Sequence, residues 1–123
     1  MTGGNSNILC LNDDEAALMT RKVLLEAHGY HVVATTHPQD AIDIIRSQLI
    51  DLVVADHFLW YTEGGKITAQ MKRLQPTLLI VLFSGVVESP EDIQGVDGVV
   101  NQIEGPNGLL NILSHFVSAR KAA

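Results

Sequence analysis

The sequence predicts an α/β domain built on a doubly wound, five-stranded parallel sheet. Short apolar runs recur along the 123 residues, and segments with apolar residues at helical spacing separate them. Strands of a parallel sheet are buried on both faces, so they read as continuous apolar runs rather than as alternating patterns. The five runs cover residues 8–11, 31–34, 52–55, 78–83 and 98–100.

The first two helices carry clear start and stop signals. The first is expected to begin near Asp14 and to stop at Gly29, because glycine suits the left-handed position that follows a helix end. The second has Pro38 at its first position, where the missing N–H costs nothing. Its apolar face should then be formed by residues 41, 42 and 45.

The remaining helices differ in length. The third is expected to start near Thr62 or Gly65 and to end before a proline at position 76. The fourth is short, since Gly95 follows about one turn after a start at Ser89. The fifth opens at Gly105 and carries a long apolar stripe.

Composition indicates one compact domain over residues 1–123, with a core from about 7 to 118. Hydrophobic residues make up 46% and charged residues 18%, and the formal net charge is −6. So acidic a chain is a poor direct binder of nucleic acid, because phosphate contacts need clustered Lys and Arg. No signal peptide or membrane span is evident, and the single Cys10 reads as a buried hydrophobe, so a reducing, cytoplasmic location is expected.

Acidic residues follow two of the predicted strands. Asp13 and Asp14 come after the first run, and Asp56 ends the third. The carboxyl ends of parallel strands face one crevice, so the three side chains should converge. Like charges that converge are costly unless a cation lies among them or one of them is protonated. We interpret the cluster as a divalent-metal site, for which Mg²⁺ is a good match. For Asp14 taken alone, a helix N-cap is the more common role.

With these residues in view, the chain resembles the receiver domain of two-component response regulators from about residue 8 to 117. The resemblance rests on the acidic pair after the first strand, on Asp56, on Gly64 eight residues beyond it, and on Ser84-Gly85 after the fourth strand. It implies the flavodoxin-like receiver fold. A simple turn remains an alternative for Ser84-Gly85.

The resemblance also implies a role for each site residue. Asp56 would accept the phosphoryl group, and Ser84 would hydrogen-bond it and act in switching. Mg²⁺ would be held by Asp13, Asp14 and Asp56, together with the backbone carbonyl of Phe58. No other cofactor is implied.

The chain departs from the family pattern on the switching and output side, at Gln102, at Val99, at Trp60, where a Pro is common, and in its short fourth helix. Gln102 stands where receiver domains usually carry a Lys, and no Lys or Arg occurs between Arg73 and Arg120. Val99 replaces an aromatic switch residue. We therefore expect Asp56 to be phosphorylated while the conformational readout is altered.

The expected function follows from the resemblance. A sensor histidine kinase or a His phosphotransfer protein would donate the phosphoryl group, and phosphorylation would alter contacts with a downstream protein, without direct nucleic-acid or membrane binding. A homodimer stays open. The chain would be no enzyme beyond assisting its own phosphorylation and dephosphorylation.

Three rival functions compete with this one. The main alternative is a pseudo-receiver, an interaction module that is never phosphorylated. An aspartyl phosphatase is disfavoured because Phe58 stands where its second Asp would be. A flavin module is disfavoured because the acidic residues after the first strand would repel a phosphate.

Overall fold

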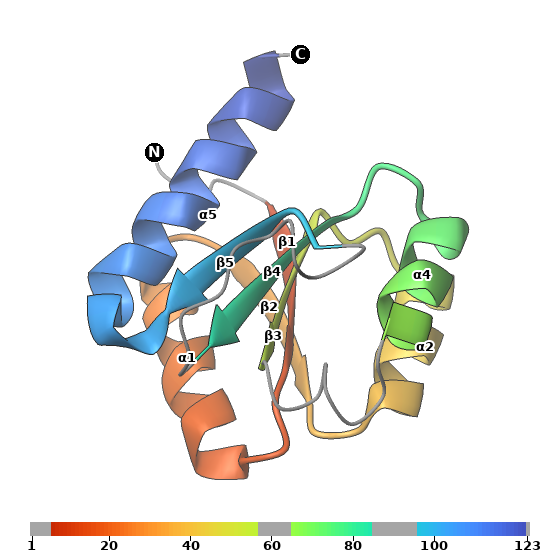
Figure 1. The fold of residues 1–123 in the computed structure, drawn as a ribbon, viewed down its shortest axis with the longest axis horizontal. Helices are drawn as coiled ribbons and strands as arrows, with labels where there is room; N and C mark the ends of the chain where they lie inside the picture. The colour runs from red at the N-terminus through yellow and green to blue at the C-terminus, as the bar shows by residue number, and fades with distance from the viewer. Residues whose placement is uncertain (1–5, 57–64, 85–95, 123) are drawn as a thin grey trace.

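The computed structural model describes residues 6–56, 65–84 and 96–122 as a parallel sheet with helices on both faces (Figure 1). The sheet has five strands in the order β2-β1-β3-β4-β5, and each neighbouring pair is parallel. This is the doubly wound architecture that the sequence predicts. The strands are β1 (Asn7–Leu11), β2 (His31–Thr35), β3 (Leu52–Asp56), β4 (Leu79–Ser84) and β5 (Gly98–Asn101).

Helices cover the two faces of the sheet in pairs. α1 (Glu15–Ala27) and α5 (Gly105–Ala122) lie on one face, whereas α2 (Pro38–Ser47) and α4 (Gly65–Leu74) lie on the other (Figure 1). Successive strand side chains point to opposite faces, so β1 serves both layers. Ile8 and Cys10 join the core beneath α1 and α5, and Leu9 and Leu11 join the core beneath α2 and α4.

Most sequence-predicted boundaries are confirmed. Each strand begins and ends within one residue of its apolar run. Gly29 follows the α1 C-cap with φ at 92°, and Pro38 is the first residue of α2. α4 is described from Gly65 and ends at Leu74, before the proline. The alternative helix start at position 62 and the short fourth helix fall outside the described residues.

One carboxylate ties three elements together at the amino-terminal edge of the sheet. The Asp97 Oδ2 accepts a hydrogen bond of 2.8 Å from the backbone N–H of Ile80, at the start of β4. The same oxygen lies 2.7 Å from the Lys72 Nζ on α4, in a partly buried ion pair. Asp97 directly precedes β5, so this contact fixes α4 against the starts of β4 and β5.

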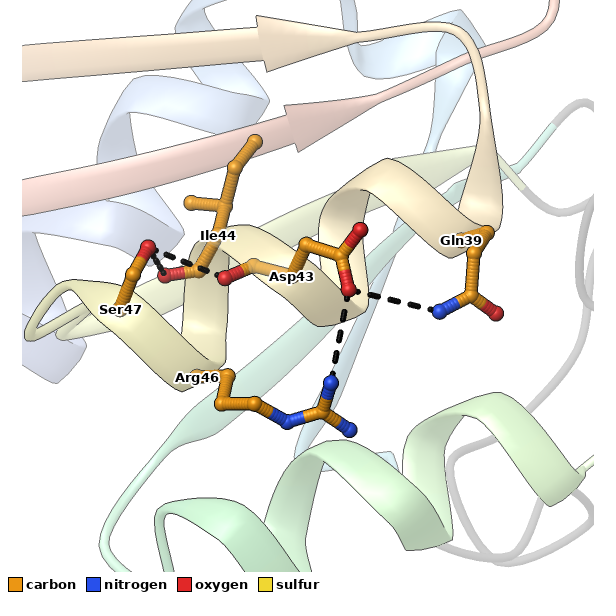
Figure 2. Close-up of polar contacts among 5 residues, drawn as sticks. All are labelled: Gln39, Asp43, Ile44, Arg46 and Ser47. Atoms are coloured by element: carbon orange, nitrogen blue, oxygen red, sulfur yellow. Dashed lines mark hydrogen bonds and ion pairs between the residues drawn. The ribbon is translucent and has the colours of Figure 1, made fainter.

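Among the described residues, the polar contacts on the outward face of α2 join side chains to neighbours within the same helix (Figure 2). The Asp43 carboxylate accepts a hydrogen bond from Gln39 at 3.5 Å and lies 3.5 Å from the Arg46 guanidinium. The Ser47 hydroxyl donates to the backbone carbonyls of Asp43 and Ile44. Exposed pairs of this kind add little stability, so the buried face holds α2 in place.

α5 approaches β5 closely because β5 begins with glycine. A Cβ on Gly98 would lie 2.8 Å from the Ile112 Cδ1 and 3.0 Å from the Phe116 Cε2. Real Cβ atoms do not tolerate the first of these separations. The missing side chain therefore leaves room for the Ile112 and Phe116 side chains of α5 to pack directly against β5.

We expect Gly98→Ala to lower the free energy of unfolding by about 1–3 kcal/mol, because the added methyl overpacks this contact. Ile112→Val removes the Cδ1 atom that the methyl would meet, so the double variant should regain part of the loss. Urea unfolding of the two single variants and the double variant measures this. Strictly additive losses would show that the contact with Ile112 is not the cause.

Candidate functional site

A pocket of about 830 Å³ opens at the carboxyl edge of the sheet. Its walls come from the ends of β3 and β4, the turn after β1, α1 as far as Leu24, the turn after β5 and the start of α5. Four predicted site residues line it together: Asp13, Asp14, Asp56 and Gln102. The parallel sheet thus gathers residues from positions 13 to 102 at one place.

Asp14 is the N-cap of α1. Its Oδ1 accepts hydrogen bonds from the backbone N–H groups of Ala16 at 3.0 Å and Ala17 at 3.3 Å. These are orphan donors of the first helical turn, which a cap residue satisfies. The structure therefore gives Asp14 the capping role that the sequence left open, whereas the exposed Asp13 accepts no such cap bond among the described residues.

Asn12 is a site residue that sequence reasoning missed. It follows β1 directly, is only 2% exposed and lines the same pocket. Its Oδ1 accepts a 2.8 Å hydrogen bond from the Asp14 backbone N–H, which fixes the turn between β1 and α1. The sequence signal for Asn12 is a polar residue directly after a buried strand, but its amide carries no charge and so does not stand out beside two carboxylates.

Within the described ranges, no group of three or more His, Cys, Asp or Glu side chains is placed to hold a metal ion. The pocket instead offers the carboxylates of Asp13 and Asp56 beside the amide of Asn12. Mg²⁺ takes one or two carboxylates and completes its octahedral shell with waters and phosphate oxygens. The oxygen donors present are compatible with such an ion.

Asp56 is the last residue of β3 and is partly buried. Leu52 and Val54 belong to the core beneath α1 and α5, so strand alternation directs Asp56 to the same side. Its Cα pairs in register with Phe83 on β4. Ser84 ends β4 opposite Asn101, while Phe58, the predicted carbonyl ligand, lies outside the described residues.

Gln102, which occupies the position of the usual receiver-domain Lys, lines the pocket. It is exposed and opens the 3-10 turn η2 (Gln102–Glu104) directly after β5. The Asn101 Oδ1 accepts from the backbone N–H of Ile103, and the Glu104 carboxylate accepts from the Asn101 backbone N–H. This reciprocal capping holds Gln102 at the pocket mouth with a neutral amide instead of a cation.

Arg21 is a second residue that sequence reasoning missed. Although charged, it is only 7% exposed, and it lines the pocket from α1. Its guanidinium carbon lies 4.7 Å from the centroid of the Phe83 ring, within the range of a cation–π contact. Burial lowers the pKa of Arg21, and the negative charge of Asp56 opposes that shift.

The signal for Arg21 was its helical spacing. It follows Leu18 by three residues and precedes Leu25 by four, so it belongs to the buried stripe of α1. A charged residue at an apolar position is costly to bury without a partner. The burial of a charged Arg21 in this stripe therefore suggests that its guanidinium has a partner or a role in the adjacent pocket.

Because Asp14 caps α1 and Asp13 does not, substitutions at the two positions should affect the free energy of unfolding differently. Asp14→Ala should lower the free energy of unfolding by about 1 kcal/mol, while Asp14→Asn, which preserves the cap, should change it by a few tenths. Asp13→Ala should have little effect because Asp13 is exposed. Urea titrations of the three variants measure this, and equal losses for Asp13→Ala and Asp14→Ala would contradict it.

Cys10 should be chemically inert while the protein is folded. Burial raises the pKa of its thiol to about 12, so the reactive thiolate is scarce at pH 8. We expect iodoacetamide to label Cys10 only after urea unfolding, as measured by mass spectrometry. The raised pKa also means that the stability contributed by this group falls as the pH rises above the ordinary value of 9.0. Rapid labelling of the native chain would contradict the burial.

Comparisons with known proteins agree with this fold. A model of the response regulator receiver domain family matches residues 8–104. The transcriptional regulatory protein ZraR of Escherichia coli (strain K12) is 27% identical over 84 residues, which cover 68% of this chain and 19% of that protein. The chain spans about a fifth of the length of the curated relatives it matches.

Solved structures show the same architecture. A CheY-like receiver domain protein from Methanospirillum hungatei JF-1 superposes with a TM-score of 0.81 at 22% identity, covering 98% of this chain and 100% of that one. A Burkholderia pseudomallei response regulator with a phosphorylated aspartic acid, calcium ion and citrate has a TM-score of 0.75 at 23% identity, covering 96% and 74%. No helix in the described ranges has the length and apolar character to cross a membrane. On the breadth of the family match, the chain belongs to the response regulator receiver domain family.

Proposed function

We propose that this chain is a phosphoacceptor domain of a two-component phosphorelay and that Asp56 takes the phosphoryl group. One observation carries the proposal: Asp56 ends β3 in an open pocket that it shares with Asp13 and Asn12. The donor would be the phosphohistidine of a sensor kinase or of a phosphotransfer protein. The family match supports the general role in two-component signalling.

The chemistry requires a carboxylate nucleophile and an offset for its charge. Asp56 would attack the phosphorus with a carboxylate oxygen, and the histidine nitrogen would leave with the bonding electrons. Receiver domains of this family bind Mg²⁺ in general, and a bound Mg²⁺ supplies positive charge beside the transferring group. Asp13 and Asp56 would hold it together with the backbone carbonyl of Phe58.

Asp14 and Asn12 take supporting roles in this proposal. Asp14 caps α1 through Oδ1, so its main effect on the metal is to orient the turn that carries Asp13. The buried amide of Asn12 reaches the same pocket as a neutral oxygen donor. Ser84, at the end of β4, would donate a hydrogen bond to the phosphoryl oxygens.

The Burkholderia regulator supports the chemistry by analogy. That protein carries a phosphorylated aspartic acid and a calcium ion on the same fold. A protein of the same fold therefore carries the two kinds of group, a phosphorylated aspartate and a divalent cation, that we propose for this pocket.

We also propose that phosphorylation alters contacts with a partner protein and that the protein works in the cytoplasm.

We expect acetyl phosphate with Mg²⁺ to add one phosphoryl group to the parent chain and none to Asp56→Asn. Asp43→Asn is the matched control, because Asp43 is an exposed carboxylate on α2, outside the pocket. Phosphate-affinity gels and intact mass spectrometry give the readout, and chelation by EDTA should abolish the reaction. An unmodified parent chain would favour the pseudo-receiver alternative.

A further inference from the structure

We propose that Arg21 is the cation that binds the phosphoryl group in this pocket, in place of the Lys that the chain lacks after β5. The inference rests on the proposed function, because it concerns the anion that Asp56 would carry. It assigns to α1 a role that receiver domains usually give to a Lys after the fifth strand.

The position of Arg21 on α1 supports the assignment. Helical side chains lean back toward the helix amino terminus, which for Arg21 is the end that carries Asp14. Arg21 and Asp56 line the same pocket and interact electrostatically. The Phe83 ring lies under the guanidinium and limits its freedom. A long, flexible side chain is thereby held ready beside the acceptor strand.

The hydrogen-bond inventory of Arg21 points to an absent ligand. Its Nη1 atom is buried and has no hydrogen-bond partner within the described part of the chain. Buried polar groups in proteins nearly always have a partner, so an exception calls for a reason. A phosphoryl group brings three acceptor oxygens, and the planar guanidinium fork matches them well. Phosphorylation of Asp56 would supply the missing acceptor.

The alternative is that Arg21 only stacks on Phe83 and offsets the charge of Asp56. The two roles predict different responses to ligands. A purely structural Arg21 affects folding, and its loss would alter metal and anion binding together. An anion-binding Arg21 repels Mg²⁺ slightly and attracts the phosphoryl group, so its loss separates the two affinities.

The test uses trifluoroberyllate, a phosphoryl mimic, titrated with saturating Mg²⁺ and followed by ¹⁹F NMR. We expect Arg21→Gln to bind the anion about fivefold to tenfold more weakly than the parent, since a charged donor is replaced by a neutral one. Mg²⁺ binding without the anion should stay unchanged or tighten. Arg21→Lys should recover part of the loss, because it restores the charge without the fork.

Two further variants make the result decisive. Arg73→Gln removes one positive charge from an exposed position on α4, across the sheet, and should bind the anion like the parent. Arg21→Met keeps an apolar stem over Phe83, so it tests the charge even if Arg21→Gln folds poorly. Urea unfolding checks each variant.

The outcomes separate this inference from the proposed function. If the parent binds trifluoroberyllate and folded Arg21→Met and Arg21→Gln bind it equally well, Arg21 is not the anion ligand, while Asp56 keeps its role. If anion and Mg²⁺ affinities fall together, Arg21 is structural. If the parent binds Mg²⁺ but not the anion, and acetyl phosphate does not modify it, the proposed function fails first and the role of Arg21 with it.

Discussion

The common direction of the five strands is the constraint on which the site depends. Because all neighbouring pairs are parallel, every strand delivers its carboxyl end to the same edge of the sheet. Residues 12 to 14, Asp56 and Gln102 meet there although at least one helix separates each from the next along the chain. The helices, in turn, are held by the alternation of strand side chains between two cores. Reversing a single central strand would move its terminal residue to the far edge.

The strands could be predicted closely because their physics is local. A strand buried on both faces must be apolar throughout, and a run such as 52–55 can be read without knowing its neighbours. Gly29 and Pro38 can be interpreted in the same way, because glycine readily adopts a positive φ whereas proline fixes its own φ at a helical value. These features depend on one residue and its immediate surroundings, so the sequence is enough.

The site was harder to predict because it depends on tertiary placement. Asp13 and Asp14 are chemically identical in the sequence, and only the start of α1 makes the second one a cap. Asn12 and Arg21 were missed for a related reason. The significance of each comes from burial beside the pocket, which the linear pattern indicates only through position on a strand end or a helix face. Phe58 remains a prediction.

The contact of Asp97 with Lys72 and Ile80 holds α4 and the starts of β4 and β5 together at the amino-terminal edge of the sheet. Its partly buried carboxylate joins a helix and two strands at the edge remote from the pocket. A charge added at the other edge acts on segments whose far ends are anchored. Any displacement caused by such a charge is therefore expected to be smaller near Asp97 than at the pocket edge.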